Sequence, residues 1–412
     1  MGKMNFSVDK NKGKEIVADE LDENEDDYDL DDSSSSSSSS SKGNDEDKAK
    51  LIKMMLIAII VVVGGIFLLM FVSSLGGSGT KTYEEIETIM SNAAESYFSD
   101  HPESLPSKDG GSQTVDVSVL VAEGKMKDLS SYTSTACSGT VKVQKVGTNY
   151  VYTPKLNCGE SYSTEELYKV VKSNNSIVSS GYGLYNKDGN YVFRGEVVDN
   201  YVQLDSALWR IVKITSSNNI VLIMDEPLNT LVAWDDRYNQ EANYNAGINN
   251  YSSSRIKEKL DELYSSTNEE TTTILLSDDD KSKLVSFNLC TGKRATTESG
   301  AEQAVECKEV LRDQKIGLLT AADYMNASID ANCTTPTSLT CQNYNYLIND
   351  YNWWLATAVT GTSSNTYMVA ANSGIESKQA MMYARIRPVI YLSSETMYLS
   401  GSGTEEDPYF VK

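Results

Sequence analysis

The stretch YNKDGNYVFRGEVVDNYVQLDSALWRIVKITSSNNIVLIM, residues 185–224, decides the fold class of this chain. Its apolar and β-branched residues gather in short runs, which are separated by Asp-Gly, Asp-Asn and Ser-Asn-Asn sequences. Short apolar runs between turn-forming residues are typical of strands joined by tight turns. We therefore expect several short strands in this part of the chain.

Helical segments accompany these strands further along. Residues 253–264, SSRIKEKLDELY, carry apolar side chains at helical spacing, with Ser253 and Ser254 as capping candidates. The segments IGLLTAADYMNAS, NWWLATAV, RIRPVIYL and SGSGTEEDPYFV follow. Short strands mixed with one or two helices predict an α+β fold for residues 182–412, the distal domain.

A smaller domain is expected upstream, at residues 82–165, and we call it the stalk domain. Thr82 and Glu85 form a T-x-x-E capping box before a helical repeat, with Pro102 just past its expected end. Alternating valines then predict half-buried antiparallel strands with a turn near residues 147–149. These valines are Val115, Val117, Val119, Val141, Val143 and Val151. The Ser/Asn-rich residues 166–181 are expected to be a linker to the distal domain.

The first fifth of the chain has a different composition. Ten carboxylates fall within residues 19–32 and nine serines follow, so residues 1–50 are expected to be a disordered acidic tail. Residues 54–75, MMLIAIIVVVGGIFLLMFVSSL, carry no charge and are long enough to cross a bilayer as a helix. We expect a membrane span over residues 51–75 and a short linker over residues 76–81.

The charges beside this span predict its orientation. Lys48, Lys50 and Lys53 lie on its N-terminal side, which places the tail in the cytoplasm and the C-terminal domains outside the cell. The formal net charge of −22 makes a large basic surface improbable, so we expect no nucleic-acid partner. The membrane itself is the expected partner of the span.

All six cysteines lie on the expected outer side, and they are Cys137, Cys158, Cys290, Cys307, Cys333 and Cys341. An even number in an extracellular segment predicts disulfides, with free buried thiols as the alternative. Pairing between sequence neighbours is the simplest arrangement, and Cys137 and Cys158 stand at equal distances from the expected turn. There is no C-x-x-C pair and His101 is the only histidine, so we expect no metal and no other cofactor.

The stalk domain resembles the head group of pilins and pseudopilins. The resemblance is carried by YEEIETIMSNAAESYFSDHPESLP followed by CSGTVKVQKVGTNYVYTPKLNC, within residues 82–160. It implies one helix leading into a small antiparallel sheet directly after a membrane helix. It also allows self-association through this domain.

The distal domain resembles a family of uncharacterised extracellular domains of Gram-positive bacteria. An ordered series carries the resemblance: YVFRGEVVDNYV, LWRIVKI, IGLL with Asp-Tyr beyond it, NWWLAT, R-P-V-I and GSGTEEDPY. The arrangement is also similar to the C-type-lectin-like class, which includes the formylglycine-generating enzymes. The resemblance implies a fold and a surface location, but it does not supply an activity.

Candidate ligand-binding residues are aromatic or charged side chains of the distal domain, namely Trp234, Asp235, Arg237, Trp353, Trp354 and Arg385. Adjacent residues on a strand point to opposite faces, so Trp354 could offer a ring for stacking while Trp353 enters the core. The alternatives are that both rings are covered, that the loop around Trp234 holds only an ion pair, and that Arg387 beside Arg385 is a buried structural residue. Residues 278–280, three aspartates, are expected to cap a helix and not to form a calcium loop.

These observations favour a binding protein. With His101 outside the distal domain, catalysis that uses a serine–histidine or cysteine–histidine pair or a zinc–histidine site is excluded there. We expect a single-pass bacterial surface protein whose distal domain binds a carbohydrate, a peptide or another surface protein. The alternatives are a structural or assembly component and, third, a carboxylate-based hydrolase.

Overall fold

In the computed structural model, which describes residues 80–205, 207–266 and 276–412, the segment 185–224 forms a succession of strands. They are β4 (Gly183–Lys187), β5 (Asn190–Arg194), β6 (Tyr201–Leu204), β7 (Ala207–Ile214) and β8 (Ile220–Met224). Asp188 and Gly189 join β4 to β5, and both have positive φ angles, which a tight hairpin turn requires. The expected strands and turns are therefore confirmed.

These strands belong to the larger sheet of the distal domain, whose main path runs in the order β16-β8-β7-β6-β18-β17. Strand β5 also pairs with β7, and β4 pairs with β5. The added strands are β16 (Val389–Leu392), β17 (Tyr398–Ser400) and β18 (Tyr409–Val411). Strand β18 lies parallel to β6, with Tyr409 opposite Val202. The end of the described chain thus completes a sheet that begins more than 200 residues earlier.

A second sheet contains the double tryptophan and has the order β14-β13-β12-β15-β9. Its strands are β9 (Leu231–Ala233), β12 (Trp353–Ala358), β13 (Asn365–Val369), β14 (Ile375–Gln379) and β15 (Tyr383–Arg385). All six residues of β12 are buried, because other parts of the domain cover both faces of this strand. Strand β12 runs parallel to β15, with Trp353 opposite Arg385.

A two-stranded sheet and short helices surround these two sheets. The sheet pairs β10 (Phe287–Cys290) with β11 (Val310–Gln314). The helices are α5 (Arg255–Ser265), α6 (Asp278–Ser282) and α7 (Ala321–Ala327), with single 3-10 turns at Tyr251–Ser253, Glu306–Lys308 and Leu339–Gln342. Ser254 caps α5, as expected. The three aspartates do not cap α6 as expected, because Ser277 is its N-cap and they form its first turn. The distal domain is therefore α+β.

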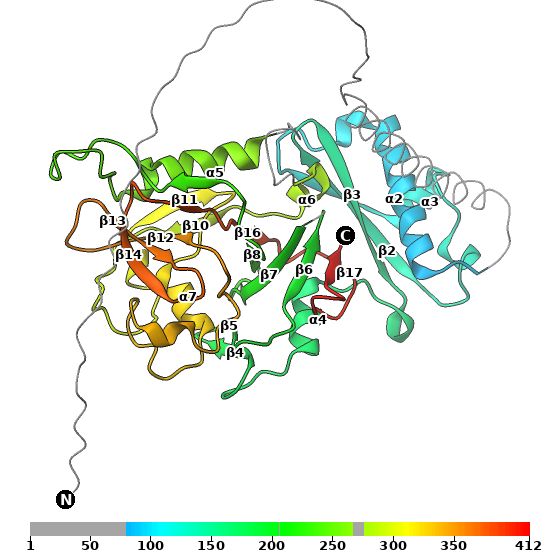
Figure 1. Cartoon of the computed structure of the whole chain (residues 1–412). Helices are drawn as coiled ribbons and strands as arrows, with labels where there is room; N and C mark the ends of the chain where they lie inside the picture. Colours follow the sequence, from blue (N-terminus) through cyan, green and yellow to red (C-terminus); the bar gives the residue numbers. More distant parts are fainter. Residues whose placement is uncertain (1–79, 206, 267–275) are drawn as a thin grey trace, which may run out of the picture. The chain divides into compact units, whose positions relative to one another are not determined.

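The stalk domain packs helix α2 (Tyr83–Asp100) against a sheet of order β1-β2-β3 (Figure 1). The strands are β1 (Ser112–Asp116), β2 (Ser138–Val146) and β3 (Asn149–Asn157), and 3-10 turns lie at Pro102–Ser104, Leu129–Ser131 and Gly159–Ser161. The capping box of Thr82 and Glu85 is present, and α2 buries an apolar stripe against the sheet. The hairpin β2–β3 turns at residues 147–148, as expected.

Two expectations for this part of the chain were wrong. Val117 and Val119 lie on a short helix, α3 (Val117–Ala122), because the Asp116 carboxylate accepts a hydrogen bond from Ser118 N and ends strand β1. The predicted linker contains helix α4 (Leu167–Asn174), which buries apolar side chains in the core of the distal domain. Residues 166–181 belong to the same compact unit as the described residues before and after them.

Three disulfides join neighbouring cysteines, as expected: Cys137–Cys158, Cys290–Cys307 and Cys333–Cys341. The first closes the open end of the β2–β3 hairpin, because its cysteines directly flank the paired residues Ser138 and Asn157. Among the described residues, no helix is both long and apolar enough to span a bilayer. The predicted tail (1–50), the predicted span (51–75) and most of the linker (76–81) lie outside the described residues.

Candidate functional site

The tryptophans that the sequence offered as a stacking surface are buried. Trp353 and Trp354 have no exposed surface, so the alternative that both rings are covered is confirmed, and Trp354 offers no outward ring for stacking. Trp354 Nε1 donates to the carbonyl oxygen of Val232 at 2.9 Å, which ties β12 to β9. Trp353 lies edge-on to Tyr324 on α7. The two rings point to opposite faces of the sheet, and both faces are covered.

The loop around Trp234 is also structural. Trp234 is fully buried, and its Nε1 donates to the carbonyl oxygen of Leu355 at 2.9 Å. The fully buried Asp235 accepts hydrogen bonds from the backbone N–H groups of Arg237 and Ile248 and forms an ion pair with the Arg237 guanidinium at 2.5 Å. This carboxylate therefore fixes the loop, which is the ion-pair alternative, and it has little capacity left for a ligand.

Arg385 and Arg387 have different surroundings. Arg387 is 1% exposed and donates to three carbonyl oxygens, those of Met224, Asp225 and Leu347, so it is the expected structural arginine. Arg385 is half-buried. Its guanidinium lies 3.5 Å from the centre of the Tyr351 ring and donates to Asn229 Oδ1 at 2.9 Å.

Arg385 lines an open groove of about 740 Å³, which we call the Arg385 groove. The groove is formed by the segment after β8, the segment before β12 and the end of β15. Its walls combine an aromatic ring, two carboxylates and several amides with a small apolar floor. The lining residues are Met224, Glu226, Pro227, Leu228, Asn229, Ile348, Asn349, Asp350, Tyr351, Asn372 and Arg385.

Two groups in the Arg385 groove are poised for a ligand. The Nδ2 of Asn349 is buried and has no hydrogen-bond partner among the described residues, whereas its Oδ1 accepts from Tyr351 N at 3.1 Å. A buried donor without an acceptor is costly, and because less than 1 Å² of the Nδ2 atom is accessible, a bound molecule relieves that cost only where the Asn349 side chain turns toward the groove. Partial burial, followed by repulsion from Asp225, raises the pKa of Glu226. Tyr351 keeps 37% of its surface exposed beside these groups.

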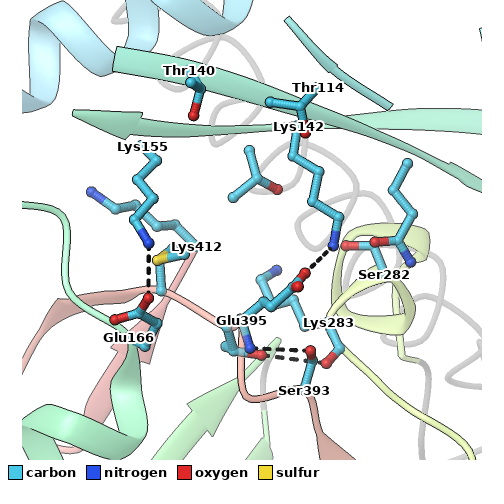
Figure 2. Close-up of a pocket in the computed structure, with 14 residues that line it drawn as sticks. Thr114, Thr140, Lys142, Lys155, Glu166, Ser282, Lys283, Ser393, Glu395 and Lys412 are labelled. Atoms are coloured by element: carbon cyan, nitrogen blue, oxygen red, sulfur yellow. Dashed lines mark hydrogen bonds and ion pairs between the residues drawn. The ribbon is translucent and has the colours of Figure 1, made fainter. Parts of the chain in front are cut away.

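A second cavity of about 290 Å³, the junction cleft, lies between the stalk sheet and the distal domain. Figure 2 shows lysines of β2 and β3 reaching acids on the opposite wall: Lys142 contacts Glu395 at 2.6 Å, and Lys155 contacts Glu166 at 2.8 Å. Two further lysines of the lining are also paired: Lys283 contacts Asp279, and Lys412 contacts Glu87. Because each of these lysines has an acidic partner, we assign this cleft to joining the two domains.

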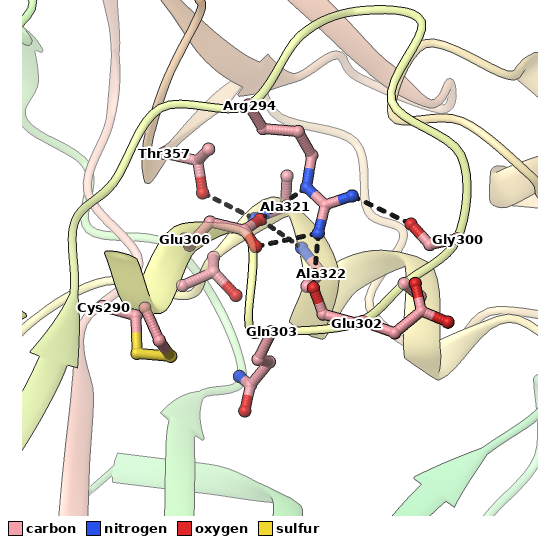
Figure 3. A network of polar contacts seen from close by, with 12 residues as sticks. Cys290, Arg294, Gly300, Glu302, Gln303, Glu306, Ala321, Ala322 and Thr357 are labelled. Carbon is pink, nitrogen blue, oxygen red and sulfur yellow. Dashed lines mark hydrogen bonds and ion pairs between the residues drawn. A yellow bond between two sulfur atoms is a disulfide. The ribbon is translucent and has the colours of Figure 1, made fainter. Parts of the chain in front are cut away.

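A buried polar network supports the loop that the Cys290–Cys307 disulfide closes. Arg294 and Glu306 have no exposed surface and form two hydrogen bonds of 2.8 Å each (Figure 3). Arg294 also donates to the carbonyl oxygens of Gly300 and Glu302, and Glu306 accepts from Ala322 N. The guanidinium and the carboxylate are therefore engaged with the protein itself.

The part of the chain that the structure describes contains no cluster of histidine, cysteine or acidic residues able to hold a metal ion. Sequence reasoning found Arg385 but missed Tyr351, Asn349 and Glu226. A signal was available only for Tyr351, which directly precedes the NWWLAT stretch. Which amides and acids meet at Arg385 depends on strand pairing that the local sequence does not encode.

Comparison with protein-family models, curated proteins and solved structures found no match to this chain.

Proposed function

We propose that this chain is a single-pass bacterial surface protein whose distal domain binds an extracellular carbohydrate in the Arg385 groove. The observation that supports the proposal most directly is the Tyr351–Arg385 stack beside Asn349, whose Nδ2 has no hydrogen-bond partner among the described residues. Sugars are held by flat aromatic faces, together with amides and carboxylates that exchange hydrogen bonds with hydroxyl groups. The lining of the groove includes all three kinds of group.

The proposed location rests on two further features. Three disulfides favour an oxidising compartment, because cytosolic proteins keep their thiols reduced. The uncharged segment at residues 54–75 supplies the proposed anchor, with the tail in the cytoplasm and both domains outside. The resemblance to extracellular domains of the C-type-lectin-like class and to pilin head groups agrees with this placement.

Binding of the full chain in detergent to an array of glycans, cell-wall fragments and mucins, with and without calcium, tests the proposal. We expect selective carbohydrate binding, which Tyr351→Ala and Arg385→Ala each weaken by about tenfold or more. Tyr238→Ala is the matched control, because Tyr238 is about half exposed and lies outside the groove lining. If binding survives Tyr351→Ala, the Arg385 groove is not the binding site. If only peptides bind, the ligand is not a carbohydrate.

A second candidate function, a carboxylate-based hydrolase, is favoured by one observation. Glu226 has a raised pKa and lines the groove together with Asp350, and glycoside hydrolysis uses a protonated acid beside an ionised carboxylate. Release of reducing ends from array carbohydrates by the wild type, and its loss in Glu226→Gln, would identify this function. Carbohydrate binding without release of reducing ends would leave binding alone as the function.

A third possibility, assembly with copies of the chain or with other envelope components through the stalk domain, predicts a different result. Crosslinking on intact cells would then capture the stalk domain in oligomers, and the Arg385 groove variants would leave that crosslinking unchanged.

A further inference from the structure

A separate cavity of about 350 Å³, the Lys213 cleft, lies away from the Arg385 groove and shares no lining residue with it. Its walls come from the β4–β5 hairpin, the segment 301–304 and helix α7. The segment 301–304 belongs to the loop that the Cys290–Cys307 disulfide closes, and Arg294 holds this loop through the carbonyl oxygens of Gly300 and Glu302. A disulfide and hydrogen bonds from Arg294 therefore hold one wall of the cleft in place.

Its floor carries a buried charge pair. Lys213 and Asp323 are each 8% exposed, and their Nζ and Oδ1 atoms are 2.7 Å apart. Asp323 is held in place by Gln303, which donates to Oδ1 at 2.6 Å, and by Thr320, which donates to Oδ2 at 2.7 Å. The carboxylate is thus fully occupied, and it holds Lys213 in a fixed position.

The ammonium group of Lys213 keeps unused donors. A lysine ammonium has three N–H groups, and within the described residues that of Lys213 makes one hydrogen bond, to Asp323. Burial acts to lower the pKa of Lys213, but the adjoining Asp323 carboxylate and other neighbours raise it overall, so the group stays charged. Buried N–H donors at the floor of a cavity are well placed for an acceptor on a bound molecule.

The charges along the Lys213 cleft vary with depth. Lys213 and the half-buried Lys187 outnumber Asp323 in the interior, whereas Asp188 and Glu302 are exposed at the rim. One net positive charge inside suits a monoanionic group and not a dianionic one. The acidic rim would favour a ligand that carries a positive charge at the end facing the solvent, in addition to its anionic group inside the cleft.

We propose that the Lys213 cleft is a second ligand site, which binds the carboxylate of a small zwitterion such as an amino acid. The carboxylate accepts hydrogen bonds from Lys213 and Lys187, and the ammonium group faces Asp188 and Glu302. No bond is made or broken. The site does not depend on the Arg385 groove, so the failure of either proposal leaves the other standing.

Isothermal titration of the full chain in detergent with three probes tests the charge arrangement. The probes are propionate (carboxylate only), β-alanine (carboxylate and ammonium) and succinate (two carboxylates). We expect β-alanine to bind more tightly than propionate, and succinate to bind most weakly. Asp188→Asn with Glu302→Gln should remove the advantage of β-alanine over propionate. No heat from any probe up to about 10 mM would overturn the proposal.

Two variants locate the binding. Ala304→Phe fills the cleft with an aromatic ring and leaves every charge in place, so it should abolish binding of β-alanine. Lys187→Met should weaken binding by about tenfold. Lys187 donates to Asn326 Oδ1 at 2.6 Å. Lys293→Met is the matched control, because Lys293 donates to Asn249 Oδ1 at 2.7 Å but lies outside the cleft. Equal binding of β-alanine by the wild type and Ala304→Phe would overturn the site.

Discussion

Individual buried charges hold the loops of the distal domain in place, and the pair Arg294–Glu306 shows how. Both side chains are fully buried, and together they tie the disulfide-closed loop to the start of α7. A buried ion pair contributes little compared with well-packed apolar residues, but removal of one partner leaves an uncompensated charge in a medium of low dielectric constant. Removal of either Arg294 or Glu306 alone should therefore strongly destabilise the folded protein.

We accordingly expect Arg294→Met to lower the free energy of unfolding by about 3–5 kcal/mol. Lys378→Met is the control, because its ion pair with Glu376 is about 40% exposed and should contribute less than about 1 kcal/mol. Urea denaturation followed by tryptophan fluorescence measures both, since all four tryptophans lie in the distal domain. Similar losses in the two variants would contradict this account of the pair.

A second residue-scale prediction concerns Asp280. Burial, together with the neighbouring Asp205 carboxyl group, raises the pKa of Asp280 to about 6, against an ordinary value of 3.8. Its Oδ2 is buried and has no hydrogen-bond partner among the described residues. Because the folded protein holds this proton more tightly than the unfolded chain, the contribution to stability is complete below about pH 4 and is lost as the pH rises through about 6.

Asp280→Asn should therefore be more stable than the wild type at pH 7, by on the order of 1–3 kcal/mol, and this difference should shrink as the pH falls from 6 to 4. Asp279→Asn removes only the smallest of the contributions that raise the pKa of Asp280, so its difference from the wild type should change with pH much less than that of Asp280→Asn. Urea denaturation at several pH values measures the difference between each variant and the wild type. A difference that is constant with pH would show that Asp280 titrates normally.

At the scale of elements, strand β12 depends on the two tryptophans for packing and not for binding. Trp354→Ala removes a fully buried ring and its hydrogen bond to Val232, so we expect it to lower the free energy of unfolding by about 3–5 kcal/mol. Tyr351→Ala, just before this strand, should cost less than about 1 kcal/mol while it weakens ligand binding. Thermal unfolding and the binding array together separate the two effects, and a stable Trp354→Ala would contradict the packing role.

The turn at Gly247 gives a second test at this scale. Gly247 has a φ of +78°, and a Cβ atom there would lie 2.0 Å from the carbonyl oxygen of Asp235. Gly361 has a φ of +82° but open space around the same position. Gly361→Ala should therefore report the backbone strain alone, about 1 kcal/mol, whereas Gly247→Ala should cost clearly more in thermal unfolding. Equal losses would mean that the loop moves freely to admit the methyl group.

Helices, strands and turns could be predicted from the sequence wherever they depend on residues that are close together in the chain. The capping box of Thr82 and Glu85, the Asp188–Gly189 turn and the pairing of neighbouring cysteines are all set by residues close together in the chain. Val117 and Val119 were misassigned because the cap at Asp116 outweighs the alternation of the valines. The burial of Trp354 and the composition of the Arg385 groove could not be predicted, since they depend on which distant strands cover β12.

At the scale of the whole molecule, the stalk and distal domains are joined through buried as well as exposed contacts. Glu87 on α2 is 3% exposed, contacts Lys412 and accepts a hydrogen bond from Tyr162 at 3.1 Å. The pair Lys142–Glu395 crosses the same junction but is more exposed. Buried charge-assisted hydrogen bonds contribute more to stability than exposed ones. We therefore expect Glu87 to stabilise the junction between the two domains more than Glu395 does.

We expect Glu87→Ala to lower the stability of the stalk domain by about 1–3 kcal/mol and Glu395→Ala by less than about 1 kcal/mol. Hydrogen exchange of the α2 amides measures the stalk domain, and tryptophan fluorescence measures the distal domain separately. Faster exchange in Glu395→Ala than in Glu87→Ala would reverse the assigned order of the two contacts.

Strand β18 sets the order of events during synthesis. Its partner β6 is made about 200 residues earlier, and the gap in the larger sheet between β6 and β17 stays open until Tyr409 and Phe410 are in place. Pairing between residues so far apart in the chain is slow to form. The distal domain can therefore close only after β18 has been synthesised, and until then the edge of β6 is open to pairing with other chains, a hazard that a chaperone would limit.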